Sequence, residues 1–158
     1  MNIRRITIGL LVLATTVTAF TVMSADDVAA QQGSEVCLEP IGDTFVRSDQ
    51  PDTNFGSETG LSVAWWEGSY ESRTYLQFDL SSLPADAEVK AAQLELTLNF
   101  SELDPLSTVL EPAAEPWDES SLTWNTKPGG LGIEGYELHD GTEGWKVWDA
   151  TSLVQGWF

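Results

Sequence analysis

The sequence predicts an all-β domain built from antiparallel strands. From Glu35 onward, apolar residues recur at every second position in short runs, and Gly, Pro, Asn and Asp separate these runs. No long segment carries an apolar stripe of helical period. The hydrophobic fraction of 42% and the seven tryptophans supply ample material for a core. Strands that are each apolar on one face need a second sheet to cover them, which favours a β-sandwich.

The first half of the pattern begins with a short strand over residues 44–47. Residues 50–57 follow as a loop, because their side chains tolerate turns and bond to their own backbone. Residues 61–66 alternate, so successive side chains point to opposite faces. This alternation places Trp65 in the core and Trp66 on the outer face.

The clearest alternations come next, over residues 73–80 and 92–100. In the latter, the pattern places Leu96 and Phe100 in the core. A weaker strand is expected over residues 108–111.

The remainder of the chain is less regular. Tryptophans at both ends of residues 117–125 are expected to pin an irregular segment to the core, and the glycines of residues 129–132 indicate a flexible loop. Residues 145–148 form a further expected strand, after which residues 149–152 can cap one helical turn.

The charge balance excludes some partners. Seven basic residues stand against 25 acidic ones, giving a net charge of −18. Binding to nucleic acid or to an anionic membrane surface depends on clustered Lys and Arg, which this chain lacks. The same charge favours solubility of an exported protein.

The N-terminal region has the composition of a secretory signal peptide over residues 1–30: a basic start, an uncharged stretch and small residues up to Ala30. We expect cleavage after Ala30, with an uncleaved N-terminal anchor as the alternative. Residues 31–39 are then a tail and residues 40–158 the folded domain, located outside the cell or at its surface. Cys37 is the single cysteine, so no intrachain disulfide can form.

A set of segments in fixed order resembles the DNRLRE-type domain, which is grouped with family 96 of carbohydrate-binding modules. These segments are Asp43-Thr44-Phe45-Val46, Asn54-Phe55-Gly56-Ser57, the run from Arg73 to Pro84, Ala92-Gln93-Leu94-Glu95-Leu96, Trp117-Asp118-Glu119 with Thr123-Trp124-Asn125, and Trp148-Asp149-Ala150-Thr151 with Val154 and Trp157.

This resemblance spans about residues 40 to 158. It implies a jelly-roll β-sandwich of secreted and cell-surface proteins, often attached to polysaccharide-active enzymes. For some members it also implies polysaccharide binding, with alginate among the targets. Members of this type continue beyond the last matching segment, so we expect this chain to lack the last strands of the sandwich.

Catalysis is not expected. His139 is the only histidine and lies in a polar stretch without a nucleophile motif, so we expect a plain surface residue. Asp118 and Glu119 beside Trp117 are the most suggestive acid pair for a glycosidase, but the resemblance implies that they anchor a loop. A polysaccharide-active enzyme is therefore the least favoured function.

Calcium is the candidate cofactor, because it binds six to eight oxygen ligands and the first loops are rich in them. The candidate ligands are Asp43, Asp49, Asp52, Asn54 and Glu58. Their spacing matches no dedicated calcium loop, and solvated loop acids are the alternative.

Sugar binding requires exposed aromatic platforms with hydrogen-bonding groups at their edges. The candidate residues are Trp66, Tyr70, Arg73, Tyr75, Gln77, Tyr136 and Trp145. Packing beneath loops is the alternative for each aromatic residue.

The sequence thus predicts a secreted, non-catalytic module that binds a polysaccharide, neutral rather than polyanionic in view of the charge. The alternative is a structural or adhesive cell-surface module without a defined sugar ligand. The oligomeric state is left open.

Overall fold

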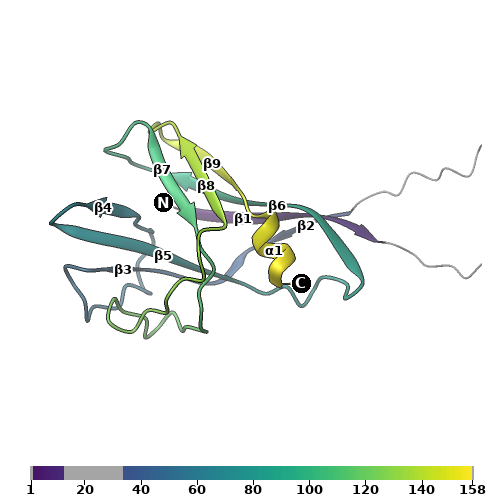
Figure 1. Ribbon diagram of the computed structural model, residues 1–158, viewed down its shortest axis with the longest axis horizontal. Coiled ribbons are helices and arrows are strands. Elements are labelled where there is room, and N and C mark those ends of the chain that lie inside the picture. Colours follow the sequence, from purple (N-terminus) through teal and green to yellow (C-terminus); the bar gives the residue numbers. More distant parts are fainter. Residues whose placement is uncertain (1, 13–33, 158) are drawn as a thin grey trace, which may run out of the picture.

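The chain folds into strands with one short helix, as the computed structural model in Figure 1 shows for residues 2–12 and 34–157. The elements are β1 (Asn2–Val12), β2 (Ser34–Leu38), β3 (Pro40–Arg47), β4 (Ala64–Trp66), β5 (Tyr70–Phe78), β6 (Ala87–Leu98), β7 (Leu106–Leu110), β8 (Gly135–His139), β9 (Gly144–Asp149) and α1 (Thr151–Trp157).

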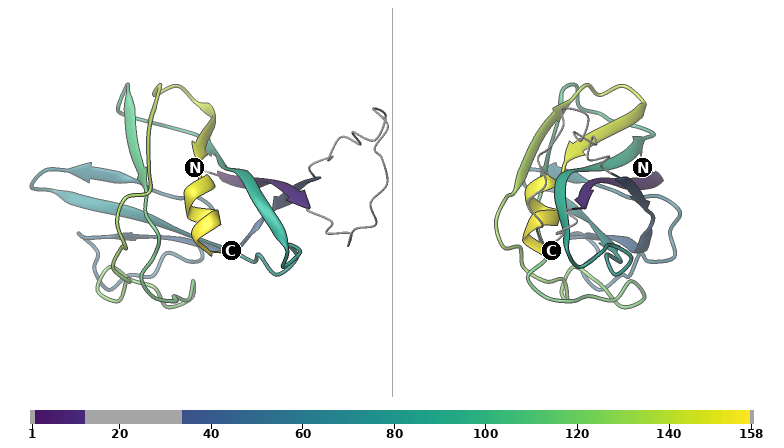
Figure 2. Two further views of the ribbon diagram at one scale, coloured as in Figure 1. Left: turned by 45° about the vertical axis from the view of Figure 1, so that its right-hand side comes forward. Right: turned by 90° about the vertical axis from the view of Figure 1, so that its right-hand side faces the viewer.

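The strands of the described residues form three antiparallel sheets. Their orders are β2-β1-β6-β9, β3-β5-β4 and β7-β8. Leu76 and Phe78 of β5 pack against core side chains of β6, so the two larger sheets face each other. Figure 2 shows α1 beside β6 at one side of this arrangement. The expected all-β sandwich is confirmed.

Strand β6 supplies the central row of the core. Ala92, Leu94, Leu96 and Leu98 are buried, whereas Gln93 between them is exposed. This is the alternation that the sequence predicts, because successive side chains of a strand point to opposite faces.

The C-terminal elements close one side of the core. Trp148 of β9 lies opposite Leu94 and is buried. The carboxylate of Asp149 accepts the Thr151 N–H at 2.9 Å, and α1 then buries Leu153 and Val154. The predicted capped helical turn is therefore confirmed.

Two predictions about the core are wrong. Trp65 is 71% exposed, because the register pairs it with Glu71, on the face of β5 that points away from the core. Trp66, which the pattern places on the outer face, instead pairs with Tyr70 and shares the face of Leu76 and Phe78, which pack against the core. Phe100 is 70% exposed, because β6 ends at Leu98 and the chain has left the sheet by that point.

The predicted N-terminal tail needs correction, whereas the signal peptide stays a prediction. Residues 34–38, expected in a tail, form β2, and Cys37 is exposed there. Of the predicted signal peptide, residues 2–12 form β1, whereas the predicted cleavage position lies outside the described residues. Within the described ranges, no helix has the length and apolar character needed to cross a membrane.

Candidate functional site

The β4–β5 hairpin ends in a tight turn that presents aromatic residues. Gly68 in this turn has a φ of 73°, a left-handed conformation that glycine adopts without strain. The register pairs Trp66 with Tyr70, and directly opposite residues of an antiparallel pair share a face. Trp65 and Glu71 form the next pair, on the other face.

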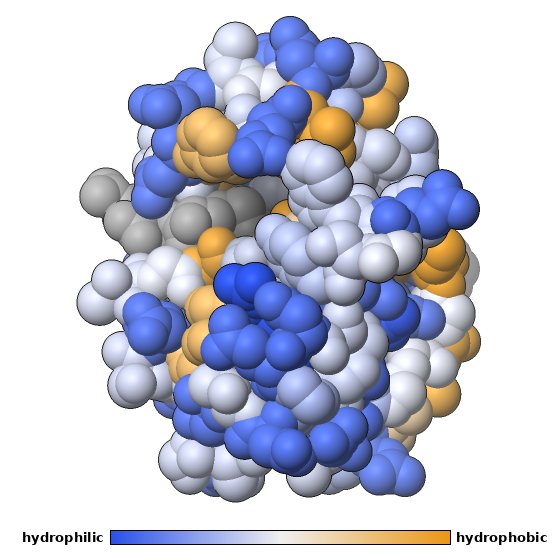
Figure 3. Space-filling view, turned by 90° about the vertical axis from the view of Figure 1, so that its left-hand side faces the viewer, coloured by the Kyte–Doolittle hydropathy of each residue, from blue (hydrophilic) through white to orange (hydrophobic). Residues whose placement is uncertain are grey.

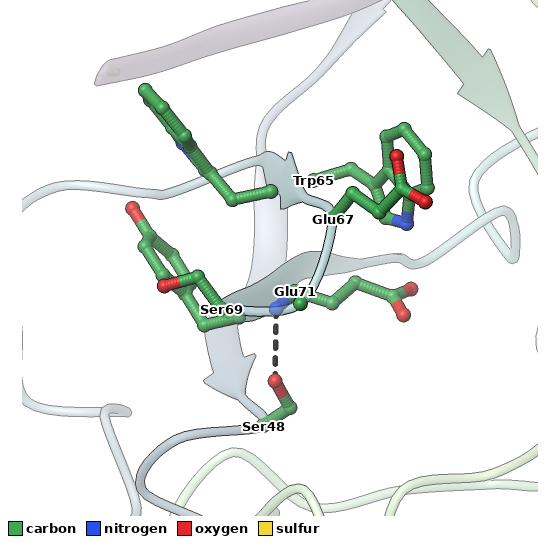
Figure 4. Close-up of a pocket in the computed structure, with 8 residues that line it drawn as sticks. Ser48, Trp65, Glu67, Ser69 and Glu71 are labelled. Carbon is green, nitrogen blue, oxygen red and sulfur yellow. Dashed lines mark hydrogen bonds between the residues drawn. The ribbon is translucent and has the colours of Figure 1, made fainter.

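An open hollow of about 290 Å³ lies at this tip (Figure 4). Its lining residues are Ser48, Trp65, Trp66, Glu67, Gly68, Ser69, Tyr70 and Glu71. The indoles of Trp65 and Trp66 are 71% and 49% exposed. Figure 4 also shows Ser48 beneath the hairpin, where its hydroxyl accepts the Glu71 N–H at 2.8 Å. This bond ties the hairpin to the turn that follows β3.

An ion pair supports the Tyr70 side of the tip. The Arg47 guanidinium donates to the two carboxylate oxygens of Asp49 at 3.0 and 2.8 Å and lies 4.6 Å from the centre of the Tyr70 ring. Hydrogen bonding between them raises the pKa of Arg47 and lowers the pKa of Asp49. Arg47 therefore remains charged against the Tyr70 ring.

The outer face of β5 carries other predicted sugar-binding residues, but the structure covers part of it. The Tyr75 hydroxyl donates to the Pro128 carbonyl at 3.2 Å, and its ring meets Trp117 edge-on at 5.8 Å between centroids. Burial raises the pKa of Tyr75. Tyr75 thus anchors the irregular segment after β7, while Gln77 on the same face is exposed.

Trp124 marks a cationic surface that the sequence does not reveal. Lys127 lies 3.7 Å from the centre of the Trp124 ring, and Arg73 lies 5.9 Å from it. Arg73 also pairs with Glu71. Burial, followed by the charge of Arg73, lowers the pKa of Lys127. Arg73 and Lys127 are far apart in the sequence, so only the packing of the irregular segment on β5 brings them together.

Tyr136 and Trp145 lie elsewhere in the fold. Tyr136 is exposed on β8 opposite Val109, and Trp145 is exposed on β9 opposite Thr97. Figure 1 places β8 and β9 away from the β4–β5 tip. Figure 3, which looks onto the end where the tip lies, shows a mostly hydrophilic surface with separate apolar patches. The predicted sugar-binding residues therefore do not form one continuous platform.

The candidate calcium ligands make several separate contacts. The Asp43 N–H donates to the Glu119 carboxylate at 3.2 Å, and partial burial followed by the Glu119 charge raises the pKa of Asp43. Asp52 accepts the Asn125 amide at 2.8 Å. Asp49 pairs with Arg47, Asn54 bonds to backbone carbonyls, and Glu58 closes a turn through its N–H. Within the described residues, no group of three or more His, Cys, Asp or Glu side chains is arranged to hold a metal ion. Calcium binding stays a prediction.

Asp118 and Glu119 have local structural partners. The Asp118 carboxylate accepts the Ser120 N–H at 3.0 Å, and hydrogen bonds from Ser120 lower the pKa of Asp118. Glu119 holds β3 through the Asp43 N–H. These contacts agree with the anchoring role that the resemblance implies.

His139 is not the plain surface residue that the sequence suggests. Its ring packs edge-on against Trp148 at 4.5 Å between centroids, and its Nε2 atom is buried without a hydrogen-bond partner. Burial lowers the pKa of His139. The β7–β8 hairpin thus carries a neutral imidazole against the core.

An antiparallel sandwich with exposed tryptophans beside an open hollow has the form of a ligand-binding module. Among known protein families, residues 34–158 match carbohydrate-binding module family 96. The chain belongs to this family, and the resemblance noted in the sequence is confirmed.

Curated relatives include much longer proteins. The chain is 27% identical over 133 residues to the tRNA3(Ser)-specific nuclease WapA of Bacillus spizizenii. It is 26% identical over 133 residues to the tRNA nuclease WapA of Bacillus subtilis strain 168. Each match covers 76% of this chain and 6% of the relative, so the chain spans only a small part of these proteins. No solved structure matches the chain.

Proposed function

We propose that the chain is a secreted, non-catalytic module that binds a polysaccharide at the tip of the β4–β5 hairpin. Membership of family 96 supports carbohydrate binding in general. The proposed binding site is at this tip because the exposed indoles of Trp65 and Trp66 lie beside the open hollow. The predicted leader supports export to the cell exterior or surface.

Trp66 is the proposed primary platform. A pyranose ring has an apolar C–H face that stacks on an indole, while its hydroxyls bond to polar groups at the edge. Trp66 shares its face with Tyr70, which Arg47 supports from below by the contact at 4.6 Å. Ser48 and the turn of the hairpin supply hydroxyl and backbone groups beside this face.

The charge around the hollow favours a neutral polysaccharide. Glu67 and Glu71 line it, and the whole chain has a net charge of −18. A polyanion would meet like charges at the rim and over the remaining surface.

The test is binding of the full chain to a panel of neutral and acidic polysaccharides, measured by affinity electrophoresis and calorimetry. We expect Trp66→Ala to weaken binding by about tenfold, because it removes one stacking contact. The melting temperature should stay within about 2 °C, because Trp66 is half-exposed at the end of a hairpin and lies outside the main core cluster.

Trp157→Ala is the matched control. Trp157 is 52% exposed and lies in α1, away from the hairpin (Figure 1). Equal affinity losses in the two variants, or full binding by Trp66→Ala, would contradict the proposed site.

A structural or adhesive role is the second candidate, and one surface favours it. Val109, Tyr136 and Leu138 are exposed on the outer face of the β7–β8 hairpin, where they form an apolar stripe. A chain that binds no polysaccharide of the panel and loses cell-surface retention on Leu138→Ser would support this role.

Residues 43–58 are rich in oxygen ligands, so Ca²⁺ is the cofactor that we propose. The test is the shift in melting temperature between Ca²⁺ and chelator. The nuclease activity in the relatives' names belongs to proteins of which the match covers 6%, and we do not propose it for this chain.

A further inference from the structure

The segment Asn2–Val12 lies inside the four-stranded sheet. Strand β1 pairs with β6 from Asn2 to Val12, with two register shifts, and with β2 from Ile6 to Leu10. The sheet order β2-β1-β6-β9 gives β2 no other ladder among the described residues. Strand β1 is therefore the strand that connects β2 to the rest of the sheet.

The position that β1 fills is one strand wide. Neighbouring strands lie about 4.8 Å apart, so β2 and β6 are separated by roughly 10 Å across β1. This separation is too large for a direct ladder between them. Without β1, both strands would present rows of unpaired backbone N–H and C=O groups toward the same gap.

The gap between β2 and β6 that β1 fills, here called the slot, has buried residues along one side of its ladders. Register shifts between Ile3 and Arg5 and between Gly9 and Leu10 interrupt strict alternation along β1. On the β6 side, Ile3, Ile6, Ile8 and Leu10 stand at the positions opposite Leu96, Leu94, Ala92 and Val89, all of which are buried. On the β2 side, Ile6 and Ile8 stand opposite Leu38 and Val36, which pack against the core. The sequence of β1 thus has an apolar residue at each of these core positions.

The remaining positions of β1 are mixed. Asn2, Arg4, Arg5 and Thr7 are polar, whereas Gly9, Leu11 and Val12 are not. Thr7 stands opposite Gln93 and Cys37, which are exposed, and Arg5 stands opposite Glu95. Opposite charges at directly paired positions stabilise an antiparallel pair. The slot therefore favours apolar residues opposite the buried residues of β6 and a cation opposite Glu95.

We propose that the slot between β2 and β6 is a binding site for an extended peptide, and that β1 is its built-in, exchangeable occupant. The fitting peptide runs antiparallel to both neighbours, with a cation opposite Glu95 and apolar residues opposite Leu96, Leu94, Ala92 and Val89. Main-chain hydrogen bonds to two strands provide affinity, and the apolar positions provide specificity. This site goes beyond the proposed sugar site and is independent of it.

The proposal connects the slot to processing of the chain. Removal of residues 1–30, which the sequence predicts, would remove β1 from the sheet. The vacated slot would then take a peptide of the same pattern from another protein. Strand insertion of this kind would join the module to its partner through a continuous sheet.

The first test compares two substitutions in the full chain. Ile8→Asp places a carboxylate at the position opposite buried Ala92, whereas Thr7→Asp places it opposite exposed Gln93. We expect the former to lower the melting temperature by on the order of 10 °C and the latter by less than about 2 °C. If the Ile8→Asp chain does not fold and the Thr7→Asp chain does, that outcome also supports the placement of β1. Equal shifts would overturn the placement of β1 in the slot.

The second test measures exchange directly. A specific protease site replaces residues 20–26 of the full chain, and the purified protein is cleaved there. We expect the N-terminal fragment to co-elute with the rest of the chain, and a labelled peptide of residues 2–12 to displace it with saturable binding. The same peptide with Ile6→Asp and Ile8→Asp should bind at least about a hundredfold more weakly, because both positions stand opposite buried residues of β6.

Two outcomes would overturn the proposal. In one, the fragment dissociates and the melting temperature of the remaining chain is unchanged, which would show that the sheet does not need a strand there. In the other, the cleaved chain forms a dimer and binds no peptide, which would assign the slot to self-association. Neither readout involves a sugar, so failure here leaves the hairpin-tip site unaffected.

Discussion

Replacing Asn54 with alanine should loosen the loop after β3 from the irregular segment after β7. The Asn54 amide donates to the carbonyls of Glu119 and Leu122, both at 2.8 Å, and its oxygen accepts the Gly56 N–H at 3.2 Å. The two segments also touch at Gly56, where an added Cβ would lie 2.2 Å from the Glu119 carbonyl oxygen. Asn54 thus joins two segments distant in the sequence through two bonds to backbone carbonyls.

The expected cost follows from these bonds. A partly buried hydrogen bond contributes about 1 kcal/mol, and carbonyls left without a donor cost more. Loss of the three bonds of Asn54 should therefore lower the free energy of unfolding by about 2–4 kcal/mol. For a domain of this size, that corresponds to a decrease in melting temperature of about 10 °C.

The assay is thermal and urea unfolding of the full chain, followed by circular dichroism, with Ca²⁺ and with chelator. Asn125→Ala is the matched control, because Asn125 is exposed and its amide makes one side-chain bond, to Asp52 at 2.8 Å. We expect it to cost less than about 1 kcal/mol. Equal losses in the two variants would refute the tethering role. A loss from Asn54→Ala that occurs only with Ca²⁺ would instead identify Asn54 as a calcium ligand.

Leu96→Asp should abolish cooperative folding, because it places an unpaired charge among buried residues of β6. The control Gln93→Asp changes a residue on the outer face and should fold normally. A soluble Leu96→Asp chain that melts cooperatively would refute this assignment of faces. For His139, burial lowers the pKa below the ordinary 6.5, so the unfolded chain binds a proton more readily than the folded one. Its contribution to stability is complete above pH 6.5 and is lost as the pH falls through the lowered value. Urea unfolding between pH 8 and pH 5 should therefore show a weaker pH dependence for His139→Phe than for the parent chain, and parallel curves would contradict this.

Much of the fold could be predicted because local pattern and sheet geometry agree. The alternation over residues 92–98 determines which side chains share a face, and the structure buries that face. The capped turn at Asp149 and Thr151 depends on neighbouring residues only, so it too could be predicted. The ordered segments over residues 40–158 identified the family correctly.

The sequence alone thus determined the strand pattern, the family and the acidic character of the chain. Only the tertiary structure decided which faces are covered. Trp65 is exposed because the β4–β5 register turns it away from the core, and Tyr75 is half-buried because a distant segment packs on it. His139 packs on Trp148 for the same kind of reason. Alternation fixes the relative orientation of neighbouring side chains, whereas burial depends on elements that are far away in the sequence and meet only in the folded chain.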